Sequence, residues 1–158
     1  MPKKPLDRID RKILSYLQAD GRMNLNDLAE KVGLSPSPCL RRVRILERDG
    51  IIARYVAVLD QRAVGLPVSA FVFIKLDRQR QEALERFAQT VRRWPEVLEC
   101  YLMTGAQDYL LRVVVPDLDA YQHFVKQKLT RLEGIASIES SFALEQVKYT
   151  NVLPLTQA

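Results

Sequence analysis

Four arginines lie within one short stretch, at spacings that can direct most of their guanidinium groups to the same side of a helix. The stretch is GLSPSPCLRRVRILERDG, residues 33–50, and its arginines are Arg41, Arg42, Arg44 and Arg48. At about 100° per residue, three of them project from one side together with Ser37, and Arg42 lies at the edge of that side. A guanidinium group binds phosphate and can donate two hydrogen bonds to a guanine edge. The spacing therefore predicts a surface that binds double-stranded DNA.

The serines and prolines of this stretch predict where the helix begins. With Ser35 as the N-cap, Pro36 becomes the first helical residue and Pro38 the third. Neither proline breaks the helix, because N–H groups of the first turn have no acceptor inside it. We expect the Ser35 side chain to accept a hydrogen bond from the Ser37 N–H. The side opposite the arginines is expected to pack on neighbouring helices through Cys39, Leu40, Val43 and Leu46.

Two further helices are predicted upstream. Asp7 can cap a helix with apolar residues at helical spacing, which ends after Gln18, and Asn24 can cap a shorter helix that ends at Gly33. Two short helices separated by a tight turn form a helix-turn-helix, whose second helix presents its N-terminus to the major groove. The predicted DNA contacts divide into base edges and phosphates, with roles that could exchange. Arg41 and Arg44 are assigned to base edges, Ser35, Ser37, Arg42 and Arg48 to phosphates, and Pro38 lies beside them.

In the rest of the chain, strand patterns alternate with helical ones. Residues 51–60 and the later ranges 69–77, 97–103, 109–115 and 135–147 have strand patterns, and 80–94 and 118–132 have helical ones. From residue 69 the order is β-α-β-β-α-β, which matches a ferredoxin-like fold. We therefore predict an α+β chain with a winged helix-turn-helix over residues 1–60, a hinge strand to about 68 and a ferredoxin-like domain over 69–158.

The predicted sheet offers large apolar side chains on both faces, from Phe71 and Phe73 in one strand and from Tyr109, Leu111, Val113 and Val115 in another. Two helices cover only one face. An apolar face without helices would otherwise meet water, so we expect it to be buried in a homodimer.

The composition limits the classes of protein to which this chain can belong. The formal net charge is +5, and residues 1–60 carry 12 Lys and Arg against 8 Asp and Glu, whereas residues 61–158 carry 12 against 11. The excess of positive charge thus coincides with the predicted DNA-binding part. Cys39 and Cys100 lie far apart with no CxxC spacing, so we predict neither a disulfide framework nor a zinc site. No other metal and no cofactor is predicted. No apolar run of about 18 residues and no secretory signal is present, which favours the cytoplasm without membrane contact.

The stretch MTGAQDYLL, residues 103–111, could hold a small molecule between two strands. Gly105 permits a positive φ that lets main-chain N–H groups face a carboxylate, and Asp108 could accept from an α-ammonium group. Tyr101 and Met103 are candidate pocket walls. These groups suit an amino acid, although the same residues also suit a simple hairpin turn.

Three segments resemble the Lrp/AsnC family of prokaryotic transcriptional regulators: LDRIDRKIL, VGLSPSPCLRRVRILERDGII and TGAQDYLL. The resemblance covers nearly the whole chain. It implies a sequence-specific DNA-binding regulator that responds to an amino acid, controls amino-acid metabolism, and forms dimers that assemble into octamers or other rings. It also implies that the effector loop consists of Thr104, Gly105, Ala106, Gln107 and Asp108, followed by Tyr109. Ile45 departs from the family, where a basic residue is common.

Two other functions remain open at this point. An enzyme is disfavoured, because His123 is the only histidine and has no nucleophile nearby in the sequence, and no P-loop, GxGxxG or HExxH motif is present. An architectural DNA-binding protein that ignores metabolites shares every feature except the effector loop. A response of DNA affinity to an amino acid would separate that alternative from a regulator.

Overall fold

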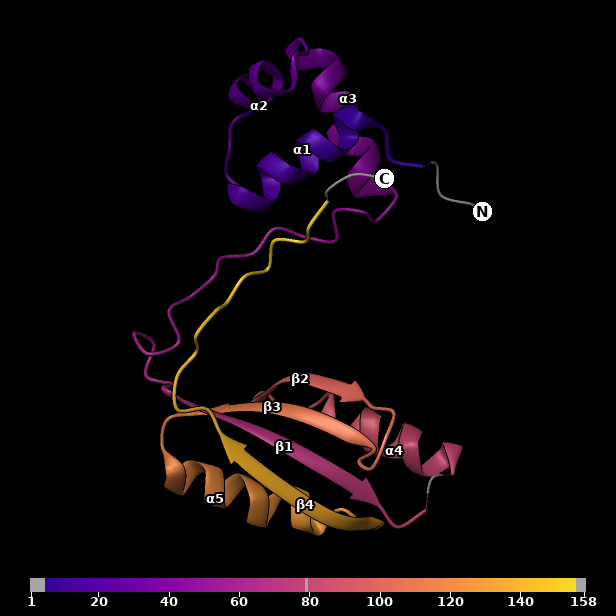
Figure 1. Cartoon of the computed structure of the whole chain (residues 1–158), viewed down its shortest axis with the longest axis vertical. Coiled ribbons are helices and arrows are strands. Elements are labelled where there is room, and N and C mark those ends of the chain that lie inside the picture. The colour runs from indigo at the N-terminus through magenta and orange to yellow at the C-terminus, as the bar shows by residue number, and fades with distance from the viewer. Residues whose placement is uncertain (1–4, 79, 156–158) are drawn as a thin grey trace. The chain divides into compact units, whose positions relative to one another are not determined.

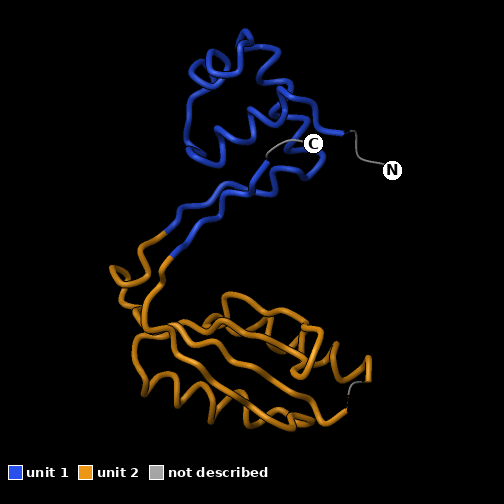
Figure 2. Tube along the Cα trace, viewed as in Figure 1, with its two compact units in different colours: residues 1–58, 148–158 blue, residues 59–147 orange. Residues whose placement is uncertain are grey.

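The computed structural model describes residues 5–78 and 80–155 and separates the chain into two compact units (Figures 1 and 2). The first unit contains residues 5–58 together with 148–155, and the second contains residues 59–147. The sequence-based boundary placed residues 148–155 with the second domain, whereas here they lie with the first unit.

Three helices form the first unit, and each begins where its capping residue predicts. They are α1 (Arg8–Ala19), α2 (Leu25–Val32) and α3 (Pro36–Arg48). The Asp7 carboxylate accepts from the Asp10 N–H at 2.8 Å, and Asn24 accepts from the Asp27 N–H at 3.0 Å. Gly33 ends α2 at φ 75°, a left-handed conformation that disfavours other residues. The buried core of the unit consists of Ile13, Leu14, Leu28, Ala29, Val32, Cys39 and Leu46.

The Asp7 cap makes the stability of this unit depend on pH. The Asp10 N–H, and after it the Arg42 guanidinium, hold the pKa of Asp7 below its ordinary value. This stabilisation is present above the unfolded-state pKa and is lost as the pH falls through the lowered folded-state pKa. We expect Asp7→Ala to lower the free energy of unfolding by about 1 kcal/mol near pH 7, and by less below about pH 3.

Urea unfolding of wild type and Asp7→Ala at both pH values tests this expectation. Asp7→Asn is the control, because asparagine also caps helices and should lose only the ion pair with Arg42. A destabilisation by Asp7→Ala that does not change with pH would contradict the assigned role of the carboxylate.

The segment that ends the described chain docks on α1. The Gln18 side-chain amide donates to the Leu153 carbonyl at 3.2 Å, and its oxygen accepts from the Leu153 N–H at 2.7 Å. Leu155 packs against the core of the three helices. These contacts explain why residues 148–155 belong to the first unit.

The second unit has the predicted element order. Its elements are β1 (Val68–Leu76), α4 (Gln81–Val91), β2 (Val97–Leu102), β3 (Tyr109–Val115), α5 (Leu118–Gln127), the short 3₁₀ helix η1 (Leu129–Arg131) and β4 (Ile135–Phe142). The strands form one antiparallel sheet in the order β2-β3-β1-β4. The α+β class and the ferredoxin-like domain predicted from the sequence are thereby confirmed.

Helices α4 and α5 cover one face of this sheet (Figure 1). The side chains predicted in β3 at Tyr109, Leu111, Val113 and Val115 all point to that covered face and are buried with Phe87 and Phe124. The other face carries the alternate residues, among them Phe71 and Phe73 of β1 and Leu110 of β3. The open face is therefore apolar in the middle, but it draws on fewer large residues than the sequence suggested.

A polar network that the sequence did not reveal lies on the same open face. The Arg112 guanidinium donates to Glu99 at 3.0 Å and to the Gln61 side-chain oxygen at 3.2 Å. Gln61 also donates to Ser69 at 3.0 Å, and Tyr101 donates to Glu99 at 3.0 Å. Residues as far apart as 61 and 112 thus stiffen one end of the face.

Three predicted elements differ from the structure. Residues 51–60 form no strand, because no neighbouring segment in the described chain supplies the ladder of hydrogen bonds that a strand needs. For the same reason β4 stops at Phe142 instead of continuing to residue 147. The helix predicted over 118–132 changes after Gln127 into η1. Among the described residues, no helix combines the length and apolar character needed to cross a membrane.

Candidate nucleic-acid interface and ligand loop

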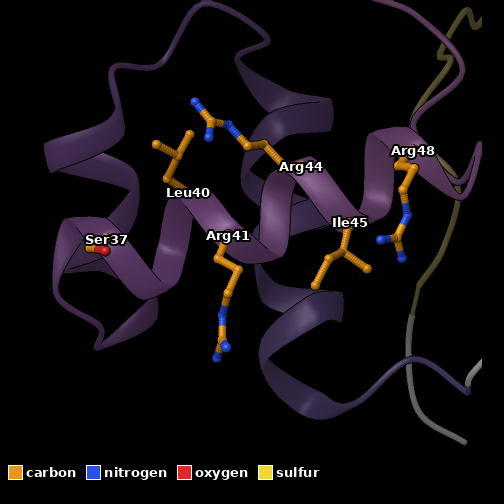
Figure 3. A pocket seen from close by; sticks show the side chains of 6 residues that line it. All are labelled: Ser37, Leu40, Arg41, Arg44, Ile45 and Arg48. Atoms are coloured by element: carbon orange, nitrogen blue, oxygen red, sulfur yellow. The ribbon is translucent and has the colours of Figure 1, made fainter.

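One side of α3 forms a shallow hollow of about 310 Å³ lined mainly by basic and apolar side chains (Figure 3). Its lining residues are Ser37, Leu40, Arg41, Arg44, Ile45 and Arg48. The four residues predicted to face outward, the serine and the three arginines, are all exposed here. The helix presents them because Cys39 and Leu46 on its other side are buried in the helical core.

The charges on this side are only partly neutralised. Arg48 contacts Asp49 at 2.9 Å, but the Arg48 side chain is 73% exposed, so this ion pair is weak. Glu47, which lies within α3, accepts from the Tyr55 hydroxyl at 3.1 Å. Burial, followed by this bond to Glu47, raises the pKa of Tyr55 to about 12. Within the described ranges, no ion pair engages Arg41 or Arg44, so both keep their charge for an anionic partner.

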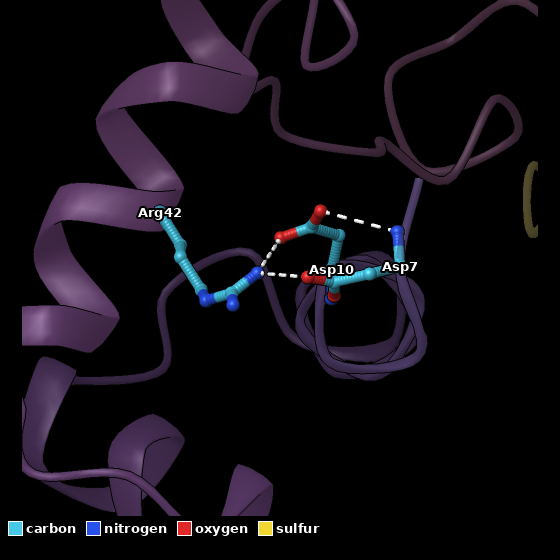
Figure 4. Close-up of polar contacts among 3 residues, drawn as sticks. All are labelled: Asp7, Asp10 and Arg42. Atoms are coloured by element: carbon cyan, nitrogen blue, oxygen red, sulfur yellow. Dashed lines mark hydrogen bonds and ion pairs between the residues drawn. The ribbon is translucent and has the colours of Figure 1, made fainter. Parts of the chain in front are cut away.

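Arg42, the fourth arginine of the predicted DNA-binding helix, is paired within the chain. Its Nη1 atom lies 2.6 Å from Asp7 Oδ2 and 2.7 Å from Asp10 Oδ1, so the guanidinium ties α3 to the first turn of α1 (Figure 4). These two carboxylates also raise the pKa of Arg42. These ion pairs favour a structural role, in which Arg42 holds the interface helix in place, and the phosphate contact stays a prediction.

The helix start agrees with the sequence in its backbone but not in its side-chain bond. Ser35 is the N-cap and Pro36 opens the helix, and Pro38 is accommodated in the first turn. The Ser35 hydroxyl makes no capping hydrogen bond, so the expected bond from the Ser37 N–H is wrong. The Ser35 carbonyl accepts from the Cys39 N–H at 3.2 Å, which is the first bond of the helix ladder. The Ser35 hydroxyl is left exposed at the positive end of the helix dipole.

Leu40 also differs from its sequence prediction. The helical spacing predicted that it would pack with Cys39 and Leu46, and Val43 does so. Of the side chains described, however, those packed on the helical core do not include Leu40, which lines the outward hollow instead. A leucine thus lies among the arginines.

The loop between β2 and β3 is built around Asp108. This residue is 5% exposed, and its Oδ2 atom accepts from the Leu76 N–H of β1 at 2.7 Å. Its own N–H donates to the Ile74 carbonyl at 2.8 Å, and its carbonyl accepts from the Met103 N–H at 2.8 Å. Asp108 therefore anchors the loop to β1, a role that the sequence could not show because Leu76 is 32 residues away.

The other predicted loop residues fall into separate groups. Met103, Thr104, Gly105 and Ala106 are exposed, and Gly105 has the predicted positive φ, at 123°. Gln107 is half-buried, and its side-chain oxygen Oε1 is buried without a hydrogen-bond partner in the described structure.

The two tyrosines of the predicted effector site point to opposite faces of the sheet. Tyr109 is buried on the covered face, where its ring contacts Phe87 at 4.5 Å between centroids and its hydroxyl donates to the Leu84 carbonyl at 2.9 Å. Tyr101 lies on the open face and is 51% exposed. Tyr109 therefore supports the loop from inside the core, while Tyr101, Met103 and the exposed loop residues are accessible to a ligand.

Two family models match this chain along its two parts. The model described as winged helix-turn-helix DNA-binding matches residues 6–53, and the model described as Lrp/AsnC ligand binding domain matches residues 69–153. This chain belongs to the Lrp/AsnC family. The resemblance drawn from the three sequence segments is thereby confirmed, and the family consists of DNA-binding transcriptional regulators and not of enzymes.

Individual relatives agree over almost their whole length. The Bkd operon transcriptional regulator of Pseudomonas aeruginosa is 48% identical over 95% of this chain and 98% of its own. The leucine-responsive regulatory protein of Escherichia coli is 43% identical over 96% of this chain and 93% of its own. A transcriptional regulator from Neisseria meningitidis, crystallised with L-methionine, is 45% identical with a TM-score of 0.91, and covers 96% of this chain and 97% of its own.

Proposed function

We propose that this Lrp/AsnC protein is a sequence-specific regulator of transcription whose affinity for DNA changes when it binds an amino acid, and that it controls genes of amino-acid metabolism. The observation that carries the proposal is the exposed side of α3, where Arg41 and Arg44 keep their charge free of ion pairs within the described chain. Base edges are assigned to these two residues, and phosphates to Ser35, Ser37 and Arg48. Pro38 keeps the first turn rigid beside them.

The loop over residues 103–108 is the proposed amino-acid site. The solved relative with L-methionine and the relative named as leucine-responsive both support an amino-acid effector. On this chain, the main-chain N–H groups around Gly105 suit the carboxylate, and the unpaired Gln107 Oε1 suits an N–H donor of the ligand. No separate cofactor is proposed.

The open face of the sheet is the proposed homodimer interface, and octamers or other rings would form from such dimers. Phe71 and Phe73 give this face an apolar centre, and a large apolar patch is expected to be covered. We expect wild type to sediment as a dimer or larger at micromolar concentration, and Phe71→Glu with Phe73→Glu to sediment as a monomer. A folded wild-type monomer at that concentration would contradict this interface.

A genome-wide pull-down of DNA fragments by the purified chain, with and without a panel of amino acids, tests the proposed function. We expect a limited set of sites whose occupancy changes with particular amino acids. Sites unaffected by every amino acid would favour the architectural alternative, and the absence of enriched sites would contradict sequence-specific binding.

A further inference from the structure

Leu40 lies on the basic side of α3 without a packing reason. It lines the same hollow as Arg41 and Arg44, and of the residues described, the core of the three helices includes its neighbours Cys39 and Val43 but not Leu40 itself. In Figure 3 its side chain points to the same edge of the hollow as that of Arg44, whereas the side chains of Arg41 and Ile45 point to the opposite edge. A partly exposed leucine gains little from folding here, which suggests a partner outside the chain.

The chemistry of the major groove supplies that partner. Each base edge there displays hydrogen-bond donors and acceptors, and thymine adds an apolar C5-methyl group. In a helix-turn-helix, residues in the first part of the second helix contact base edges. Leu40 is in the second turn of α3, whereas Ile45, the other aliphatic residue of the hollow, lies beyond the helix midpoint.

We infer that Leu40 is a specificity-determining residue that contacts the methyl group of a thymine in the DNA site. The inference rests on the proposed function, because it requires that this side of α3 enters the major groove. Arg44 follows Leu40 by four residues, about 6 Å along the helix. Base pairs are about 3.4 Å apart, so the thymine lies within about two base pairs of the base that Arg44 contacts.

Replacing thymine by uracil isolates this contact, because uracil keeps the O4 acceptor and loses only the methyl group. A duplex is first selected from a random library by the full-length wild-type chain. Each thymine of that duplex is then replaced singly by deoxyuridine, and affinity is measured by fluorescence anisotropy. For wild type we expect one thymine in each half-site at which the replacement weakens binding about fourfold, the value of one buried methylene.

Three variants complete the experiment. In Leu40→Ala the penalty for uracil at that thymine should disappear, whereas in Ile45→Ala, the matched aliphatic control, it should persist. Leu40→Met keeps an apolar side chain of similar volume and should retain most of the penalty. Because Leu40 does not pack in the core, Leu40→Ala is expected to fold, and circular dichroism checks this. If Leu40→Ala does not fold, the uracil penalty of Leu40→Met is compared with that of wild type instead.

The outcomes separate this inference from the function on which it rests. A uracil scan that is flat for wild type, or a penalty that persists in Leu40→Ala, would overturn the role of Leu40 while leaving DNA binding intact. Failure of the wild-type chain to select any duplex would overturn the proposed function and the inference with it.

Discussion

Reversing the charge of Arg41 and Arg44 together, as Arg41→Glu and Arg44→Glu, is expected to weaken binding to a selected duplex by on the order of a thousandfold or more. Each arginine is exposed and has no ion pair in the chain as described. Wild type therefore gives up no internal ion pair when the two guanidinium groups contact DNA. The variant loses two base contacts and adds repulsion between carboxylates and phosphates. Titration of the duplex at two salt concentrations measures both effects.

Arg42→Gln is the matched control, because it removes one arginine of the same helix that points inward to Asp7 and Asp10. Its expected effects are a lower melting temperature and a largely unchanged dependence of affinity on salt. The double variant must still show the helical circular dichroism of wild type. Retained duplex binding by the folded double variant would remove α3 as the interface.

Replacing Asp108 is expected to abolish the response to amino acids for two separable reasons: the loop loses its anchor on β1, and the ligand loses a carboxylate. In Asp108→Ala the Leu76 N–H loses the acceptor that lies 2.7 Å away in wild type. A buried donor without a partner costs about 1–3 kcal/mol, so the loop should detach from β1 and the second unit should melt earlier. Isothermal titration with L-methionine and L-leucine, beside thermal unfolding, measures the two consequences.

Asp108→Asn distinguishes anchoring from charge. Asparagine can still accept from the Leu76 N–H, so the melting temperature should stay near that of wild type. If the carboxylate also attracts the α-ammonium group of the ligand, this variant should lose amino-acid binding without losing stability. Unchanged amino-acid binding in Asp108→Ala would remove the loop from the effector site altogether.

The parts of the fold that depend on neighbouring residues could be predicted from the sequence. Asp7, Asn24 and Gly33 act on the next or preceding turn, so the helices of the first unit begin and end where expected. The same holds for the order of strands and helices in the second unit, because alternation within each strand is local.

Features that depend on distant partners could not be predicted. The helical wheel placed Arg42 beside the DNA-binding side, but its partners Asp7 and Asp10 lie more than thirty residues earlier in the chain. Asp108 shows the same limit, because its acceptor role is fixed by the backbone of β1. The alternation over residues 51–60 predicted a strand, and the local pattern contained no information about whether a partner strand exists.

The docking of Leu153 and Leu155 on the three-helix unit has a consequence for how that unit folds during synthesis. Domains generally fold from the N-terminus as they emerge from the ribosome. Here α1 and its core meet a packing partner, Leu153, that is translated 135 residues after its contact Gln18. The three helices can collapse early, but they acquire these contacts only after residues 59–147 have been synthesised, so a truncation before Leu153 would weaken a unit that begins at the other end of the described chain.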